Sequence, residues 1–232
     1  MNRRELFQML RTAAVPAAAA TIVQAGSVAG PTKSSNCTTP AHEGPRAGFF
    51  PNFVVMDQDG TKARFYEDLV RGKIVLFNFF YADCEARCPL YTANLVKVQE
   101  LLGDRVGRDI FMYSLTLDPV HDRPRVLKDY MKMHGVKDGW TFLTGRPAEM
   151  EELRKRLGFT DIDPAVDKEK SEHLGIIRYG NEKLDRWAAC PAATRPETIV
   201  EYLSWLDPNK PPQGLKAKPV QTSDASRKGE LL

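Results

Sequence analysis

Apolar and polar residues alternate along the chain in blocks of two kinds. The first kind is a short run of consecutive apolar residues, such as IVLFNFF at residues 74–80, which is typical of a strand buried on both faces of a parallel sheet. Residues 110–117 and 140–143 repeat this pattern. The second kind is an amphipathic stretch, such as residues 89–102, in which apolar side chains recur at helical spacing. The alternation of the two kinds predicts strands separated by helices.

Turn and capping residues define further elements. The segment Asp57-Gln58-Asp59-Gly60 separates two short apolar stretches and predicts an N-terminal β-hairpin. A second helix is expected between Pro124 and Gly135, and a third between Pro147 and Gly158, because proline is favoured in a first helical turn and glycine just past a helix end.

The pattern changes after the third helix. Residues 161–170 have no period and predict a polar loop. A second hairpin is expected with its turn at Gly180-Asn181, followed by a last helix over residues 195–206. Because strands that alternate with helices form parallel sheets, this order predicts an α/β thioredoxin-like sandwich. Its central mixed sheet would have helices on both faces and the N-terminal β-hairpin at its start.

Two cysteines, Cys84 and Cys88, lie where the strand of residues 74–80 gives way to the helix of residues 89–102. A helix N-terminus has unpaired N–H groups and the positive end of the helix dipole, so we expect the pKa of these thiols to fall below that of an unperturbed cysteine. With three residues between them, the sulfurs can close a small disulfide or ligate one soft metal ion. Chemistry in such a fold gathers at the carboxyl ends of the strands, which is where this pair falls.

The composition excludes some classes of function. The 232 residues are 42% hydrophobic and 27% charged, with a net charge of +3, which is no electrostatic footprint for nucleic acid. Four cysteines are too few to form a disulfide scaffold in a chain of this length, so the close pair indicates a local redox or metal site.

Both ends of the chain differ from its middle. Residues 1–30 resemble a twin-arginine export signal, because Arg3 and Arg4 precede an alanine-rich stretch. Residues 31–48 are polar and proline-rich and predict a linker, residues 49–207 the folded domain, and residues 208–232 a disordered tail. Export would place the cysteines in the periplasm or outside the cell, and an uncleaved signal would associate the protein with the membrane.

Four features follow one another along the chain: FFYADCEARCPLYTANLVKVQELL, SLTLDPVHDRPRVLKDYMKMHG, WTFLTGRPAEMEELRKRLGF and a single histidine ahead of IIRYGNEKLDRW. Together they resemble the Sco/SenC family in that family's order and spacing. The resemblance covers roughly residues 49–206, and the histidine, His173, follows the second cysteine by about 85 residues.

The resemblance implies an exported copper chaperone that assists metallation of the dinuclear copper centre of cytochrome c oxidase, or reduces the cysteines of that centre. Its partner would be the copper-bearing subunit of the oxidase or another copper protein. Cys84, Cys88 and His173 match the copper ligands of the family. Asp118 and Asp122 match its acidic positions, and we expect them to support the ligands or to cap a helix and not to bind metal.

Two other functions fit the same residues. A thiol-disulfide oxidoreductase or peroxidase would use Cys84 to attack and Cys88 to resolve, and a sensor would relay copper or redox state to partners. The three-residue spacer and the lack of a proline just before Ile176 favour metal binding, because thioredoxin-type oxidoreductases resemble one another in having a two-residue spacer and that proline. Two buried structural thiols, or half of a zinc site, are the remaining interpretations.

The other cysteines and histidines are weaker candidates. Cys37 lies in the linker, and Cys190 is interpreted as a thiol without a catalytic role, a partner of Cys37, or a resolving thiol for the active pair. We expect His121 to be a solvated turn residue and His134 a charge at a helix C-terminus.

Overall fold

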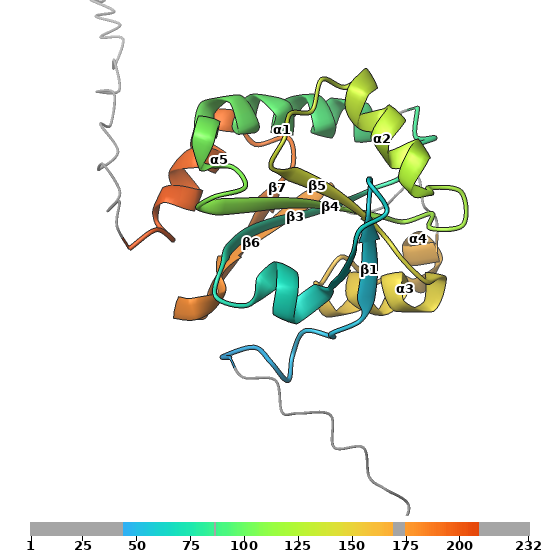
Figure 1. Ribbon diagram of the computed structural model, residues 1–232, viewed down its shortest axis with the longest axis horizontal. Helices are drawn as coiled ribbons and strands as arrows, with labels where there is room; N and C mark the ends of the chain where they lie inside the picture. The colour runs from blue at the N-terminus through green and yellow to red at the C-terminus, as the bar shows by residue number, and fades with distance from the viewer. Residues whose placement is uncertain (1–43, 86, 169–174, 209–232) are drawn as a thin grey trace, which may run out of the picture. The chain divides into compact units, whose positions relative to one another are not determined.

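A mixed sheet of seven strands organises the part of the chain that the structure describes. The structure is a computed structural model, and it describes residues 44–85, 87–168 and 175–208 (Figure 1). The strand order is β2-β1-β5-β4-β3-β6-β7. The strands are β1 (Val54–Asp57), β2 (Lys62–Arg64), β3 (Ile74–Phe80), β4 (Ile110–Thr116), β5 (Trp140–Thr144), β6 (Ile176–Asn181) and β7 (Arg186–Pro191).

Helices cover both faces of this sheet. They are α1 (Cys88–Leu102), α2 (Pro124–Met133), α3 (Pro147–Arg156), α4 (Pro164–Lys168) and α5 (Pro196–Ser204), with the π-helix η1 (Phe65–Val70) and the short 3₁₀ helices η2 (Gly103–Arg105) and η4 (Glu182–Leu184). Figure 1 shows α1 and α2 on one side of the sheet and α3 on the other. The core follows this division, because side chains from α1, α2 and α5 pack in one cluster and those from η1 and α3 in a second. The predicted α/β sandwich, with helices on both faces of a mixed sheet, is confirmed.

The strand β3 lies inside the sheet, parallel to β4 and antiparallel to β6. Its side chains alternate between the two cores: Leu76 and Phe80 pack with α1, whereas Val75, Phe77 and Phe79 pack with α3. Because both faces are covered, the strand needs no polar alternation, which is why its sequence is a continuous apolar run. The predicted bounds of this strand are confirmed.

The N-terminal hairpin is also confirmed. The strand β1 pairs antiparallel with β2, and Gly60 completes the turn with a φ of +83°, a conformation that glycine adopts without a steric penalty. The other edge of β1 pairs antiparallel with β5 through Met56 and Asp57.

The polar loop predicted over residues 161–170 is wrong in part, because it contains the short helix α4. The carboxylate of Asp163 accepts the backbone N–H of Ala165 at 2.8 Å in the first turn of this helix. Asp167 is held by the guanidinium of Arg154 on α3, at 2.6 and 2.7 Å. Five residues are too few to show a helical period, so this element depends on tertiary contacts.

The turn of the second hairpin also differs from the prediction. Gly180 and Asn181 continue β6, and η4 makes the turn. A Cβ on Gly180 would lie 2.3 Å from the ring of Trp187, so glycine is needed here for close packing across the pair and not for a turn. Glu182 anchors the actual turn, because its buried carboxylate accepts the hydroxyl of Tyr66 and the N–H of Gly72, both at 2.7 Å.

No helix in the described ranges is both long enough and apolar enough to cross a membrane. The export signal predicted at residues 1–30, most of the predicted linker and nearly all of the predicted tail lie outside the described residues.

Candidate functional site: the cysteine pair

The two cysteines lie beyond the carboxyl end of β3, as predicted. The backbone N–H of Leu117 donates to the carbonyl of Phe80 at 2.7 Å, so β3 and β4 stay together up to their last residues. The chain then turns, with the N–H of Cys84 donating to the carbonyl of Tyr81 at 3.3 Å. Helix α1 begins at Cys88 with Pro89 in its first turn. This strand-to-helix connection therefore positions both thiols.

The thiols are close together and buried. Cys84 is 6% exposed and Cys88 1%, and both belong to the core formed with α1, α2 and α5. The N–H of Cys88 donates to the sulfur of Cys84, with 3.4 Å between nitrogen and sulfur. The sulfur of Cys84 thus lies at the N-terminus of α1, and the pair has the proximity that either a shared soft metal ion or a disulfide requires.

The expected fall in thiol pKa is wrong for Cys88. Burial raises the pKa of this thiol to about 12, and the neighbouring Cys84 adds to the rise. Backbone hydrogen bonds at Tyr81 and Cys88 lower the pKa, but burial outweighs them. The free energy that a thiolate loses by leaving water is larger than the free energy that it gains from these hydrogen bonds. At neutral pH the Cys88 thiol is therefore protonated.

A buried carboxylate holds the segment that leads to the cysteines. Asp122 is 2% exposed, and it accepts the N–H of Ala82 at 3.1 Å and the hydroxyl of Thr116. Burial raises the pKa of this carboxyl above its ordinary value, although both hydrogen bonds lower it. Because Ala82 lies two residues before Cys84, Asp122 ties the cysteine segment to the loop after β4.

The alternative role expected for the acidic residues, helix capping, is wrong. The N-cap of α2 is Arg123, whose side chain makes no capping hydrogen bond. Asp118 pairs with the imidazole Nδ1 of His121 at 3.0 Å, and the side chain of His121 is exposed, as expected for a turn residue.

Sequence reasoning missed Tyr130 of α2, which belongs to the core that contains both cysteines. Its ring lies 5.0 Å from that of Phe80, and its hydroxyl is 2.8 Å from the hydroxyl of Thr92 on α1. Burial raises the pKa of this phenol, and the ring belongs to the same core as Cys84 and Cys88. The spacing of Leu127 and Tyr130, both on the buried face of α2, is the signal that could have identified it.

The third predicted ligand, His173, lies outside the described residues. The described residue nearest to it in sequence after the gap is Gly175, which is in close contact with α1. A Cβ on Gly175 would lie 2.3 Å from the hydroxyl of Tyr91, three residues after Cys88. Within the described ranges, no three His, Cys, Asp or Glu side chains are grouped so that they could hold one metal ion.

The remaining candidates are His134, whose ring lies 4.2 Å from that of Tyr130, and Cys190, which belongs to the same core as the cysteine pair. His134 is the C-cap of α2, as its predicted position requires, but partial burial lowers its pKa and so reduces its charge. Cys190 is buried in β7, and burial raises its pKa. Its predicted pairing with Cys37 stays a prediction, because Cys37 lies outside the described residues.

Comparison with known proteins shows the family to which the chain is similar. A family model described as SCO1/SenC matches residues 41–178, more than half of the chain. An SCO2-like protein of Rickettsia felis is 32% identical over 159 residues, which are 66% of this chain and 74% of the relative. An SCO1 protein homolog of Bacillus subtilis is 31% identical over 103 residues, 44% of this chain, so the match spans about half (52%) of that relative's length.

A solved structure shows the same fold. Bradyrhizobium japonicum ScoI with copper bound is similar with a TM-score of 0.54 and 21% identity, over 67% of this chain and 97% of the solved chain. At this level of identity the similarity concerns the fold, and it confirms the predicted thioredoxin-like class.

Proposed function

Because the chain belongs to the SCO1/SenC family, we propose that it is an exported copper chaperone that holds copper through Cys84, Cys88 and His173. It would deliver this copper to the dinuclear centre of cytochrome c oxidase or to another copper protein. The observation that carries the proposal is the pair of adjacent, buried thiols at the start of α1 in a chain of this family.

The donor set suits copper as cargo. Two thiolates favour soft Cu(I), and an imidazole is a ligand for copper in either oxidation state. The structure of ScoI was solved with copper bound, which supports the same cargo here. Copper binding would displace the proton of Cys88, whose thiol has a pKa of about 12, so we expect apparent affinity to rise with pH.

The position of Gly175 supports His173 as the third ligand. Gly175 packs against Tyr91, in the first turn of the helix that begins with Cys88. Its carbonyl also accepts the N–H of Ala192 at 2.7 Å. Only Leu174 separates Gly175 from His173 in the sequence.

Redox state would control loading. Reduced Cys84 and Cys88 can bind copper, whereas a disulfide between them cannot. The proximity of the two residues, with 3.4 Å between the nitrogen of Cys88 and the sulfur of Cys84, favours such a disulfide once the thiols are oxidised.

The test is an anaerobic titration of the reduced full chain with Cu(I) and Cu(II) against a competing chelator, following bound copper and sulfur-to-copper absorption. We expect one tightly held copper per chain, lost in Cys84→Ser and in Cys88→Ser and weakened in His173→Ala. The matched controls are Cys190→Ser, a buried thiol of β7, and His121→Ala, an exposed imidazole. If either control lowers copper binding as much as the predicted ligands do, the ligand assignment is wrong.

The second candidate is a thiol-disulfide oxidoreductase in which Cys84 attacks and Cys88 resolves. The adjacency of the thiols favours it, but a resolving thiol with a pKa of about 12 is rarely ionised at neutral pH. The same protein, assayed for turnover of a disulfide substrate, distinguishes the two: turnover without retained copper would favour the enzyme.

The site of action follows from the N-terminus. The twin-arginine pattern of Arg3 and Arg4 supports export to the periplasm, with membrane association if the segment is not cleaved. The partner would then be a copper-bearing protein on that side of the membrane.

A further inference from the structure

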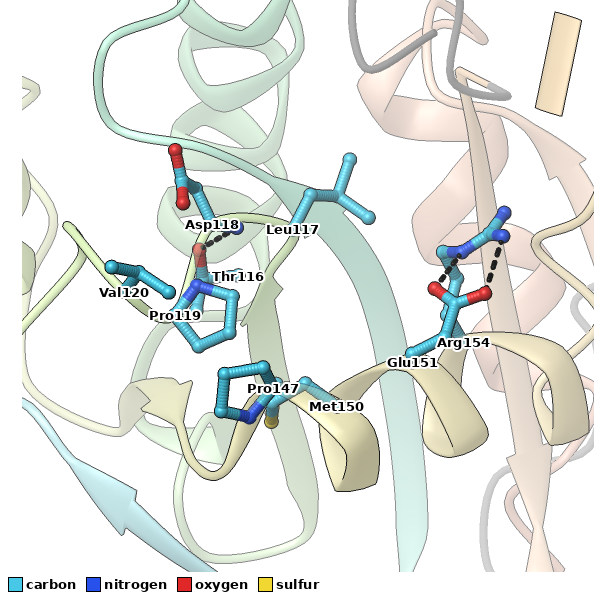
Figure 2. Close-up of a pocket in the computed structure, with 9 residues that line it drawn as sticks. All are labelled: Thr116, Leu117, Asp118, Pro119, Val120, Pro147, Met150, Glu151 and Arg154. Carbon is cyan, nitrogen blue, oxygen red and sulfur yellow. Dashed lines mark hydrogen bonds and ion pairs between the residues drawn. The ribbon is translucent and has the colours of Figure 1, made fainter. Parts of the chain in front are cut away.

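A groove of about 770 Å³ opens beside the N-terminal hairpin, between β1 and the loops that follow β4 and β5. Val54, Val55 and Met56 of β1 form one wall, and Pro119, Val120 and Pro147 belong to the other. Val54 and Val120 are each 52% exposed, so apolar surface is open to solvent here. A smaller hollow of about 170 Å³ shares Pro119, Val120 and Pro147 (Figure 2). Figure 2 shows the rings of these two prolines facing one another.

A buried hydroxyl in the groove lacks a partner. Thr144, the last residue of β5, lines the groove and is only 6% exposed. Its Oγ1 makes no hydrogen bond to any residue that the structure describes. Buried polar groups are normally satisfied, because an unmade hydrogen bond costs free energy. A ligand bound in the groove would supply the missing partner.

The backbone of β1 is also open toward the groove. The N–H of Phe65 donates to the carbonyl of Phe53 just before β1, and the N–H of Asp57 donates to the carbonyl of Thr61. Alternate residues along this stretch therefore bond toward the side of β2. The residues between them, including Val54, direct their N–H and C=O groups to the other side. There β5 ends at Thr144, opposite Met56, so Val54 lies beyond the last pair of that ladder. An extended peptide can bond to a strand at such a position.

The rim of the groove is positively charged. Lys62, Arg123 and Arg146 line it, and the side chain of Arg146 is 81% exposed. Glu149 is the one carboxylate among the lining residues of the groove, and it pairs with Arg146. Apolar walls, an open strand position and a cationic rim together select an extended segment that carries both acidic and apolar side chains.

We propose that this groove docks an extended acidic segment of the protein that exchanges copper with this chain; the identity of that partner as a copper protein rests on the proposed function. The groove and the thiols share one loop. Val120 and Arg123 line the groove, while Asp122, between them in sequence, bonds to Ala82 beside the cysteine segment. A partner held in the groove is therefore anchored on the loop that positions Cys84.

The probe is a fluorescein-labelled heptapeptide of sequence DEVTVED, titrated with the full chain at low salt and followed by anisotropy. The control peptide has lysine at its four acidic positions. We expect saturable binding of the acidic peptide alone, weakened at least tenfold in the double variant Lys62→Glu, Arg123→Glu. Arg125→Glu is the matched charge control, because that side chain is 94% exposed on α2 and does not line the groove. It should change the dissociation constant less than twofold.

Thr144→Val tests the buried hydroxyl. The substitution keeps the shape of the side chain, and loss of one hydrogen bond to the peptide should weaken binding about fivefold. Thermal unfolding should show stability unchanged or increased, because the unsatisfied hydroxyl is removed. A purely structural role would instead lower stability and leave peptide binding intact, which would overturn the assignment of this residue.

Other outcomes overturn the docking proposal. Equal binding of the lysine peptide, or no effect of the charge reversals, excludes an acidic segment as the occupant. Sedimentation that shows a dimer broken by Val120→Glu, with no competition by the peptide, would assign the groove to a second copy of the chain. Copper titration keeps this test separate from the proposed function: the groove variants should bind copper normally, and Cys84→Ser should bind the peptide normally. Failure of one measurement thus leaves the other standing.

Discussion

Replacement of Asp122 by alanine should loosen the cysteine segment. The carboxylate is buried and accepts hydrogen bonds from the N–H of Ala82 and the hydroxyl of Thr116. Hydrogen bonds to a charged group contribute about 1.5–3 kcal/mol each. Against this stands the cost of burying the carboxylate, which is evident in its raised pKa. We therefore expect Asp122→Ala to lower the free energy of unfolding by about 2–4 kcal/mol.

Asp122→Asn separates charge from hydrogen bonding. Asparagine keeps an acceptor oxygen and has no charge to desolvate, so its cost should be about 1 kcal/mol. The raised pKa of Asp122 also predicts a pH dependence: the folded state binds the proton more tightly than the unfolded state does. Stability from this group is then greatest at low pH and is lost as the pH rises from the unfolded pKa, near 3.8, through the raised folded pKa. The asparagine variant should lack this decline.

Urea unfolding and copper competition measure the two consequences. Residues that orient metal ligands typically change metal affinity about 10–100-fold when replaced, so Asp122→Ala should weaken copper binding by at least tenfold. Asp129→Ala, an exposed carboxylate on α2, is the control and should leave both quantities unchanged. The reasoning is refuted if Asp122→Ala unfolds at the same urea concentration as the parent and holds copper equally well.

Three further predictions concern the surroundings of the site. Gly175→Ala would place a Cβ 2.3 Å from the hydroxyl of Tyr91 and should cost about 1–3 kcal/mol in urea unfolding, a loss that the added substitution Tyr91→Ala should largely recover. Arg154 lowers the pKa of Asp167 from 3.8 to about 2, so the ionised carboxylate stabilises the folded state above pH 3.8. This stabilisation should be lost as the pH falls from about 4 to about 2. Unfolding midpoints across that range should change less in Asp167→Asn, and an equal slope would contradict the assignment. Tyr130→Phe removes the phenol hydroxyl that pairs with the buried hydroxyl of Thr92, and it should lower the free energy of unfolding by about 1 kcal/mol. No change in urea unfolding would show that this contact is dispensable.

Local sequence determined the central part of this protein. The run at β3 is apolar at nearly every position because both faces of the strand are covered, and that information is local. Pro89 and the helical periodicity after it place the start of α1, and hence the two cysteines at the carboxyl end of the strand. The hairpin turn ending in Gly60 is also a local feature, because the positive φ of this residue requires glycine whatever packs around it.

Contacts between distant residues decided the rest. Gly180 is indistinguishable in sequence from a turn glycine, but Trp187 across the hairpin requires the space, and Glu182 anchors the turn further on through Tyr66. Helix α4 forms where Asp167 meets Arg154, a contact that no periodicity encodes.

The properties of the thiols belong to the tertiary structure as well. The position of the thiols at a helix N-terminus predicts a lowered pKa, and that position can be inferred from the local sequence. Burial of Cys88 among α1, α2 and α5 reverses it, because desolvation depends on everything that packs around the sulfur. Sequence alone located the cysteines. Their environment, in which Asp122 bonds to the cysteine segment and Tyr130 shares the core of the pair, was determined by the fold.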